Sequence, residues 1–94
     1  MMLIWSAHSV ADREAIFDHV LAENPQAAIR LDERLSAAAN HLCEFPMSGR
    51  AGRVDGTREL VVAGTPYIIA YHVGADRIRI LRLLHGAQQW PDGF

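Results

Sequence analysis

Two short turn segments divide the apolar stretch between residues 57 and 85 into three parts. The turns are Gly64-Thr65-Pro66 and Gly74-Ala75-Asp76, and the parts between them are rich in β-branched and aromatic residues. This composition and the short turns predict strands at residues 57–63, 67–73 and 77–85, arranged as an antiparallel meander. Because such a sheet must bury its apolar face, the chain needs a second layer.

A helix pair in the first half of the chain is the expected second layer. The first helix is expected to begin at Ser9, with Asp12 in the capping-box position. The second is expected to run from an Asn24 cap to about Cys43. A short strand at residues 3–5 precedes both helices. The expected fold is therefore α+β, with an N-terminal strand, an αα-hairpin and a three-stranded antiparallel meander in one domain, residues 1–94.

All basic residues of the chain are arginines, and they are concentrated in its second half. Residues 1–47 contain three Arg and seven acidic residues, whereas residues 48–85 contain six Arg and three acidic residues. The formal net charge of −2 excludes a generally basic nucleic-acid-binding protein. The segregation indicates a basic working surface, formed by the meander and the Gly-rich loop 46–56, on an acidic scaffold.

Several other classes of protein are excluded by missing residue types. Cys43 is the single cysteine, so an internal disulfide and a cysteine-based zinc site are both ruled out. The five His are scattered without the spacing of metal ligands. No apolar run approaches the roughly 20 residues that cross a bilayer. We expect a cytoplasmic protein with no metal, no cofactor and no membrane contact.

The arginines and one histidine are candidates for cleaving a phosphodiester bond by attack of the neighbouring 2′-hydroxyl. This reaction needs no metal, but it needs cations at the phosphate, a general acid and a general base. Arg58 and Arg82 are the candidate cations, and His85 is the candidate acid. Glu59 is the possible base, with Glu44 as the alternative. The candidate substrate-binding residues are Arg50, Arg53 and Arg79.

Strand alternation predicts which face of the sheet these side chains take. Arg82 has the parity of Ile80, and Arg58 has the parity of Leu60. Both arginines are therefore expected among core aliphatic residues. There each one either pairs with a buried carboxylate or lies where the sheet opens into a cleft. His85 is expected on the opposite face.

Short motifs in a fixed order run along nearly the whole chain. They are Ile4-Trp5-Ser6, Ala11-Asp12, Asn24-Pro25, Ala27-Ala28, Gly49-Arg50, Gly52-Arg53-Val54, Gly56-Thr57-Arg58-Glu59-Leu60-Val61, Pro66-Tyr67-Ile68-Ile69, Ile80-Leu81-Arg82 and Leu84-His85-Gly86-Ala87-Gln88-Gln89-Trp90-Pro91. Their order and spacing resemble the RelE/ParE superfamily of toxins from type II toxin–antitoxin modules. The resemblance implies a βααβββ fold and a cognate antitoxin that neutralises the toxin. The αα-hairpin and the sheet edge are the expected docking surfaces, and any operator DNA would be bound through the antitoxin.

The superfamily has two branches with different targets. RelE-like members cut mRNA on the ribosome, whereas ParE-like members inhibit DNA gyrase and lack a nuclease site. Arg58 matches an arginine that nuclease members place on the first meander strand, and Arg82 and His85 match the region of their further catalytic groups. The resemblance thus implies a growth-arresting toxin, and we expect ribosome-dependent mRNA cleavage. The alternative is gyrase inhibition, which the absence of Lys and of a Tyr after the last strand favours.

Overall fold

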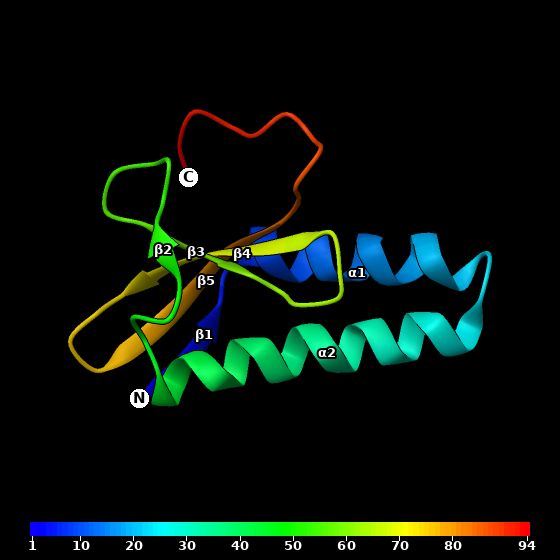
Figure 1. Ribbon diagram of the computed structural model, residues 1–94, viewed down its shortest axis with the longest axis horizontal. Coiled ribbons are helices and arrows are strands. Elements are labelled where there is room, and N and C mark those ends of the chain that lie inside the picture. Colours follow the sequence, from blue (N-terminus) through cyan, green and yellow to red (C-terminus); the bar gives the residue numbers. More distant parts are fainter.

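A five-stranded mixed sheet with the strand order β1-β5-β4-β3-β2 lies at the centre of the computed structural model, which describes residues 1–94 (Figure 1). The strands are β1 (Met2–Trp5), β2 (Arg50–Ala51), β3 (Arg58–Val61), β4 (Tyr67–Val73) and β5 (Arg77–His85). The helices are α1 (Ala7–Leu21) and α2 (Pro25–Glu44). The predicted α+β fold is confirmed, and β4 and β5 have the predicted bounds. Neither helix is long and apolar enough to cross a membrane.

Strands β3, β4 and β5 form the predicted antiparallel meander, and two further strands extend it. Strand β1 pairs parallel to β5, with Met2 opposite Arg77, so the start of the chain lies beside its last strand. Strand β2 pairs antiparallel to β3, with Arg50 opposite Glu59. Residues 50 and 51 were expected in a loop. A two-residue strand has no periodic pattern, so the sequence gives no signal for it.

The first helix begins three residues earlier than predicted. Ser6, not Ser9, is its N-cap, and the Ser6 side chain accepts a hydrogen bond from the Ser9 backbone N–H at 3.1 Å. Ser9 is buried in the first turn, where its hydroxyl donates to the Ser6 carbonyl at 2.8 Å. The second helix begins as predicted, with the Asn24 side chain accepting from the Ala27 N–H.

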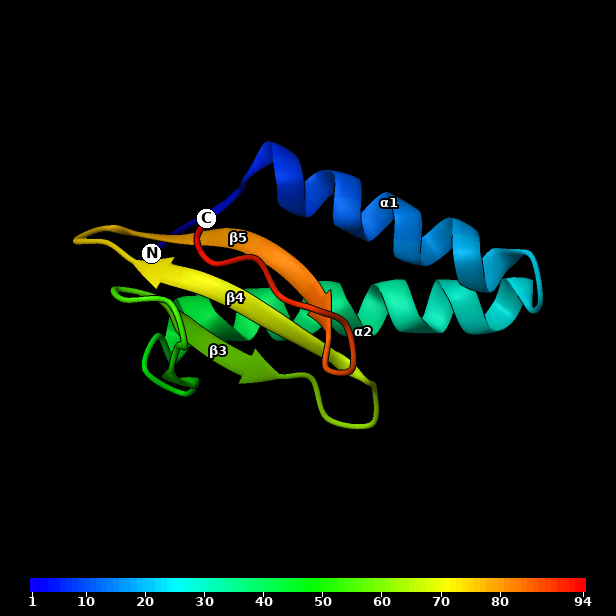
Figure 2. The ribbon, with the colours of Figure 1, turned by 90° about the horizontal axis from the view of Figure 1, so that it is seen from above.

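Helix α2 covers one face of the sheet, and the C-terminal segment 86–94 crosses the other (Figures 1 and 2). The main core lies between α2 and the sheet, where Leu35 and Leu42 pack in one cluster with Ile69 and Ile80. Helix α1 lies beside α2 and along the edge of β5 beyond β1 (Figure 2). The sheet therefore has a core face toward α2 and a far face toward segment 86–94.

A β-bulge in β5 changes the predicted distribution of side chains. Tyr71 is opposite Ile80, but the preceding residue Ala70 is opposite Arg82, so Leu81 has no partner on β4. The extra residue reverses the alternation, because residues before and after it with equal parity then lie on opposite faces. The prediction that Arg82 shares the core face with Ile80 is therefore wrong, and Arg82 lies on the far face.

Candidate functional site

Most of the predicted site residues lie on the far face of the sheet, in or near one row across four strands. Arg50, Glu59, Ala70 and Arg82 are successive register partners on β2, β3, β4 and β5. Arg53 reaches the same row from the loop that follows β2. The structure thus brings together four of the candidate residues that are far apart in the sequence.

Glu59 is the centre of this row, although its side chain is only 3% exposed. Its Oε1 accepts from Arg50 Nη2 at 3.0 Å. Its Oε2 accepts from the backbone N–H of Arg53 at 2.8 Å and from Arg53 Nε at 3.3 Å. Burial alone would raise the pKa of Glu59, but the hydrogen bonds from Arg53 and Arg50 outweigh it and hold the pKa below its ordinary value. The residue is thus a buried, ionised anchor for the loop.

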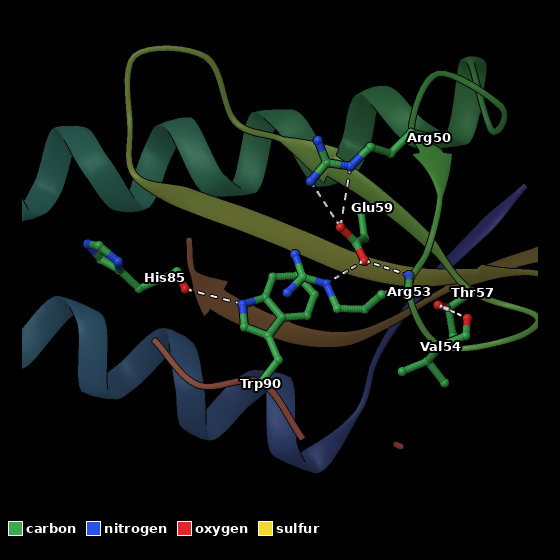
Figure 3. A network of polar contacts seen from close by, with 7 residues as sticks. All are labelled: Arg50, Arg53, Val54, Thr57, Glu59, His85 and Trp90. Atoms are coloured by element: carbon green, nitrogen blue, oxygen red, sulfur yellow. Dashed lines mark hydrogen bonds and ion pairs between the residues drawn. The ribbon is translucent and has the colours of Figure 1, made fainter. Parts of the chain in front are cut away.

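The guanidinium of Arg53 also contacts the C-terminal segment. It lies 3.6 Å from the centroid of the Trp90 ring, which is a close cation–π contact (Figure 3). The indole N–H of Trp90 donates to the His85 carbonyl at 3.4 Å. Arg53 therefore joins the buried carboxylate of Glu59 to the segment that crosses the far face.

Arg82 is held by a carboxylate at the other end of the row. Asp12 of α1 accepts from Arg82 Nε at 2.7 Å and from Nη2 at 3.0 Å, and Asp12 Oδ2 also accepts from the Leu83 N–H at 3.0 Å. The hydrogen bonds that Arg82 donates to Asp12 raise the pKa of Arg82 above its ordinary value. The carboxylate therefore pairs with Arg82 and satisfies a backbone N–H of β5.

Arg58 lies on the core face, away from the row, as its parity with Leu60 predicts. It is opposite Tyr71, a fully buried member of the core. Its Nη2 donates to the carbonyl oxygens of Met47 and Gly49. The Tyr71 hydroxyl donates to the Pro46 carbonyl at 2.8 Å and accepts from the Gly49 N–H at 3.0 Å. Together Arg58 and Tyr71 fix the chain where it leaves α2.

A glycine is required at position 49 by this packing. A Cβ there would lie 2.6 Å from the Tyr71 hydroxyl and 2.7 Å from the Glu59 carbonyl oxygen. Both distances are far below a normal contact, so the loop can approach β3 and β4 only without a side chain at this point.

His85 lies at the end of β5, opposite Tyr67 and in edge-to-face contact with its ring. Its Nδ1 accepts from the Ala87 N–H at 3.0 Å, so the remaining ring nitrogen, Nε2, is the one available to a ligand. The sequence predicted His85 on the face opposite Ile80. The bulge reverses this, because Tyr67, the partner of His85, packs against the core.

Arg79 is the last of the predicted residues, and it lies apart from Glu59. It is opposite His72 near the turn between β4 and β5. It lines a hollow of about 750 Å³ between the start of α1, the loop 54–57 and the end of the chain.

Two residues with important contacts were missed by the sequence analysis. Asp12 was interpreted as part of a helix cap, but it pairs with Arg82 across 70 residues of sequence. Tyr71 was assigned only to a strand, but its hydroxyl anchors the loop. The acidic residue at the start of a helix and the tyrosine in an apolar strand were the only signals available.

A different hollow lies on the helix side of the molecule. It has a volume of about 640 Å³, and its apolar walls come from Trp5 of β1 and from Val10 and Phe17 of α1. Acidic residues line its border, and the Arg13 guanidinium lies 5.0 Å from the centroid of the Trp5 ring while Arg13 pairs with Asp32 at 2.7 Å.

Comparisons with known proteins assign this fold and these motifs to one family. Residues 3–90 match the sequence profile described as the ParE toxin of the type II toxin–antitoxin system parDE. The chain is 40% identical over 87 residues to protein Y4kP of Sinorhizobium fredii, covering 93% of this chain and 90% of the relative. It is 38% identical over 86 residues to toxin RelE2 of Caulobacter vibrioides, covering 92% and 96%.

A solved structure has the same fold. The chain matches a chain of the chromosomal ParDE toxin–antitoxin system from P. aeruginosa with a TM-score of 0.82 and 27% identity, over 90% of this chain and 95% of that one. The strand order, the helix pair and the motif string agree with the family found by sequence. The protein therefore belongs to the ParE toxin family of type II toxin–antitoxin systems, within the RelE/ParE superfamily, and has an antitoxin as its partner.

Proposed function

We propose that this toxin arrests growth by binding DNA gyrase, and not by cutting mRNA on the ribosome. The observation that carries the proposal is that Arg58 and Arg82 lie on opposite faces of the sheet. A phosphate cannot contact two cations that are separated by the sheet itself, so these residues do not form one cleavage site. The absence of Lys and of a Tyr after the last strand supports gyrase as the target, and so does the match of residues 3–90 to the ParE toxin profile.

The partners of the two arginines support the same conclusion. Arg82 is bound by both oxygens of Asp12, and Arg58 by two backbone carbonyls. Each guanidinium would have to leave these contacts before it could stabilise a phosphate. Preorganised catalytic cations instead point at the position where charge develops.

Glu59 is poorly suited to the role of general base. A base that works near neutral pH has a pKa close to that pH. The pKa of Glu59 is instead lowered, because Arg53 and Arg50 donate hydrogen bonds to both oxygens. Proton abstraction by this carboxylate would weaken the contacts that hold the loop.

We assign antitoxin docking to the apolar hollow at Trp5, Val10 and Phe17. Val10 of α1 is 43% exposed, so an apolar side chain of this hollow is accessible to a partner. Glu14 and Asp18 line the same hollow, so an antitoxin segment with apolar residues flanked by basic ones would complement it.

The experiment is induction of the chain alone in bacteria, with and without the substitution His85→Gln. Under the proposal, both forms should block DNA synthesis and induce the DNA-damage response while translation continues. His85→Gln removes the candidate acid but leaves the contacts of Arg82 and Glu59 intact. The matched control is His19→Gln, an exposed histidine on α1.

Two results would contradict the gyrase proposal. One is a prompt fall in protein synthesis with mRNA cut at codon-phased positions. The other is loss of toxicity in His85→Gln but not in His19→Gln. Purified toxin and gyrase provide the direct measurement, in which the toxin should inhibit DNA supercoiling at concentrations that leave ribosome-bound mRNA intact.

A further inference from the structure

Two of the nine arginines, Arg30 and Arg79, have no hydrogen-bonding or ionic partner within the chain. The other seven each bind a carboxylate or a backbone carbonyl. A guanidinium is always charged and carries five N–H donors. Among the arginines on the sheet strands, Arg79 is the one with all five donors unengaged within the chain, so all of them are available to an external anion.

Arg79 lies in a concave setting that contains other donors. The hollow of about 750 Å³ is also lined by His72 of β4 and His8 of the first turn of α1. His72 and Arg79 are direct partners on neighbouring strands, so their side chains start from the same face and only a few ångströms apart. His8 lines the same hollow but belongs to α1, so the hollow has donors from a helix as well as from the sheet.

The hollow is lined by more basic residues than acidic ones. Its lining residues include Arg79, Arg82 and two histidines, and Asp55 is their single acidic residue. Arg82 is already neutralised by Asp12 from outside the hollow. The hydroxyls of Ser6 and Thr57 are also occupied, because they donate to the carbonyls of Leu81 and Val54. The donors that remain free are those of Arg79, His72 and His8.

We propose that this hollow binds a phosphate monoester, with Arg79, His72 and His8 as the phosphate ligands. A terminal phosphate has three acceptor oxygens and about two negative charges near neutral pH, which suits one guanidinium and two imidazoles. A carboxylate carries one negative charge instead of about two, so it would interact more weakly with the Arg79 guanidinium.

The walls of the hollow indicate what the phosphate is attached to. Val54, Leu81 and Phe94 contribute its apolar surface. An apolar wall that includes the aromatic Phe94 beside a phosphate site suits a nucleobase, and the volume lies within the range of small-molecule sites. The ligand class is therefore a nucleoside monophosphate, and binding of such a ligand does not depend on the proposed action on gyrase.

The test is a titration of the purified full-length chain, followed by amide chemical shifts at constant ionic strength. The probes are inorganic phosphate, adenosine monophosphate and an RNA oligonucleotide without terminal phosphates. We expect saturable shifts around His72, Gly56 and Arg79 with both phosphates, and tighter binding of the monophosphate. Arg79→Gln should weaken binding at least about tenfold, since it removes a charge-assisted contact. His72→Gln should weaken it by a smaller factor.

Arg30→Gln is the matched control, because Arg30 is the other free arginine and lies on α2. Equal weakening in Arg30→Gln and Arg79→Gln would overturn the proposal, as would shifts that do not saturate. Tighter, Arg79-dependent binding of the oligonucleotide would also overturn it, in favour of a nucleic-acid backbone. The outcome is independent of the gyrase assays, because the titration contains neither gyrase nor DNA.

Discussion

Asp12 and Arg82 are separated by 70 residues in sequence and joined by two hydrogen bonds of 2.7 and 3.0 Å. The same carboxylate also accepts from the Leu83 N–H. Strand β1 pairs with β5 only as far as Ile80, so the edge of β5 beyond that point lacks a strand partner. Asp12 therefore takes the place of a neighbouring strand at this edge and attaches α1 to the sheet.

Replacing Asp12 with alanine should destabilise the protein by about 2–3 kcal/mol, because it removes three hydrogen bonds and leaves Arg82 without its counter-charge. Both side chains are partly buried, with 16% of Asp12 and 25% of Arg82 exposed. Urea unfolding gives the free energy. Asp18→Ala on the exposed side of α1 is the control, and an equal loss in the two variants would show that Asp12 has no special role.

Tyr71→Phe should lower the free energy of unfolding by about 1–2 kcal/mol, because the buried Gly49 N–H and the Pro46 carbonyl lose their shared hydrogen-bonding partner. Tyr67→Phe is the matched control on the same strand, because no hydrogen bond involves the Tyr67 hydroxyl in this structure, and it should change stability by less than about 0.5 kcal/mol. Thermal or urea unfolding of the two variants would decide the point. Similar values for both would contradict the anchoring role of Tyr71.

Glu59 should make stability depend on acid pH. Its pKa is lower in the folded protein than in the unfolded chain, so the unfolded chain binds a proton more readily. The stabilisation is fully present above the ordinary glutamate pKa of about 4.3 and is lost as the pH falls through the lower folded value. Glu59→Gln should lower stability at pH 7 and reduce its decline between pH 5 and 3. An unchanged acid decline in Glu59→Gln, relative to the exposed control Glu33→Gln, would count against this account.

Arg53 should control the mobility of the C-terminal segment. Arg53 and Arg50 both bind Glu59, but only Arg53 contacts the Trp90 ring. Arg53→Gln should therefore increase hydrogen exchange at the amides of residues 86–90, whereas Arg50→Gln should leave them unchanged. Exchange followed by mass spectrometry or NMR measures the difference. If both variants release the segment equally, the ion pairs hold it and the cation–π contact does not.

The sequence was sufficient to predict the bounds of those helices and strands that have clear residue patterns at their ends. Gly and Pro marked the ends of β4 and β5, and Asn24 with Pro25 marked the start of α2. At the start of α1, Ser6 and Ser9 were both acceptable caps, and only the position of β1 decides between them. Pairing of β2 with β3 depends on a loop conformation that has no periodic pattern.

The bulge explains why the site was harder to predict than the fold. The run Leu81-Arg82-Leu83-Leu84 is compatible with either face, so alternation alone could not show that Arg82 and Ile80 lie on opposite sides. The hydrogen-bonding partners of the two arginines also could not be predicted from local sequence patterns, because they lie elsewhere in the chain. The carboxylate that binds Arg82 comes from α1, and the carbonyls that bind Arg58 are those of Met47 and Gly49, in the segment between α2 and β2.

The parallel pairing of β1 with β5 sets the order in which a newly made chain can become active. Residues 2–5 are synthesised well before residues 77–80, with which they pair. Such a distant contact forms only after most of the chain is available, because closing the long loop between the strands costs entropy. The sheet of a nascent chain therefore stays open along β5 until residues 77–80 have been translated, and the toxin fold cannot be completed before then.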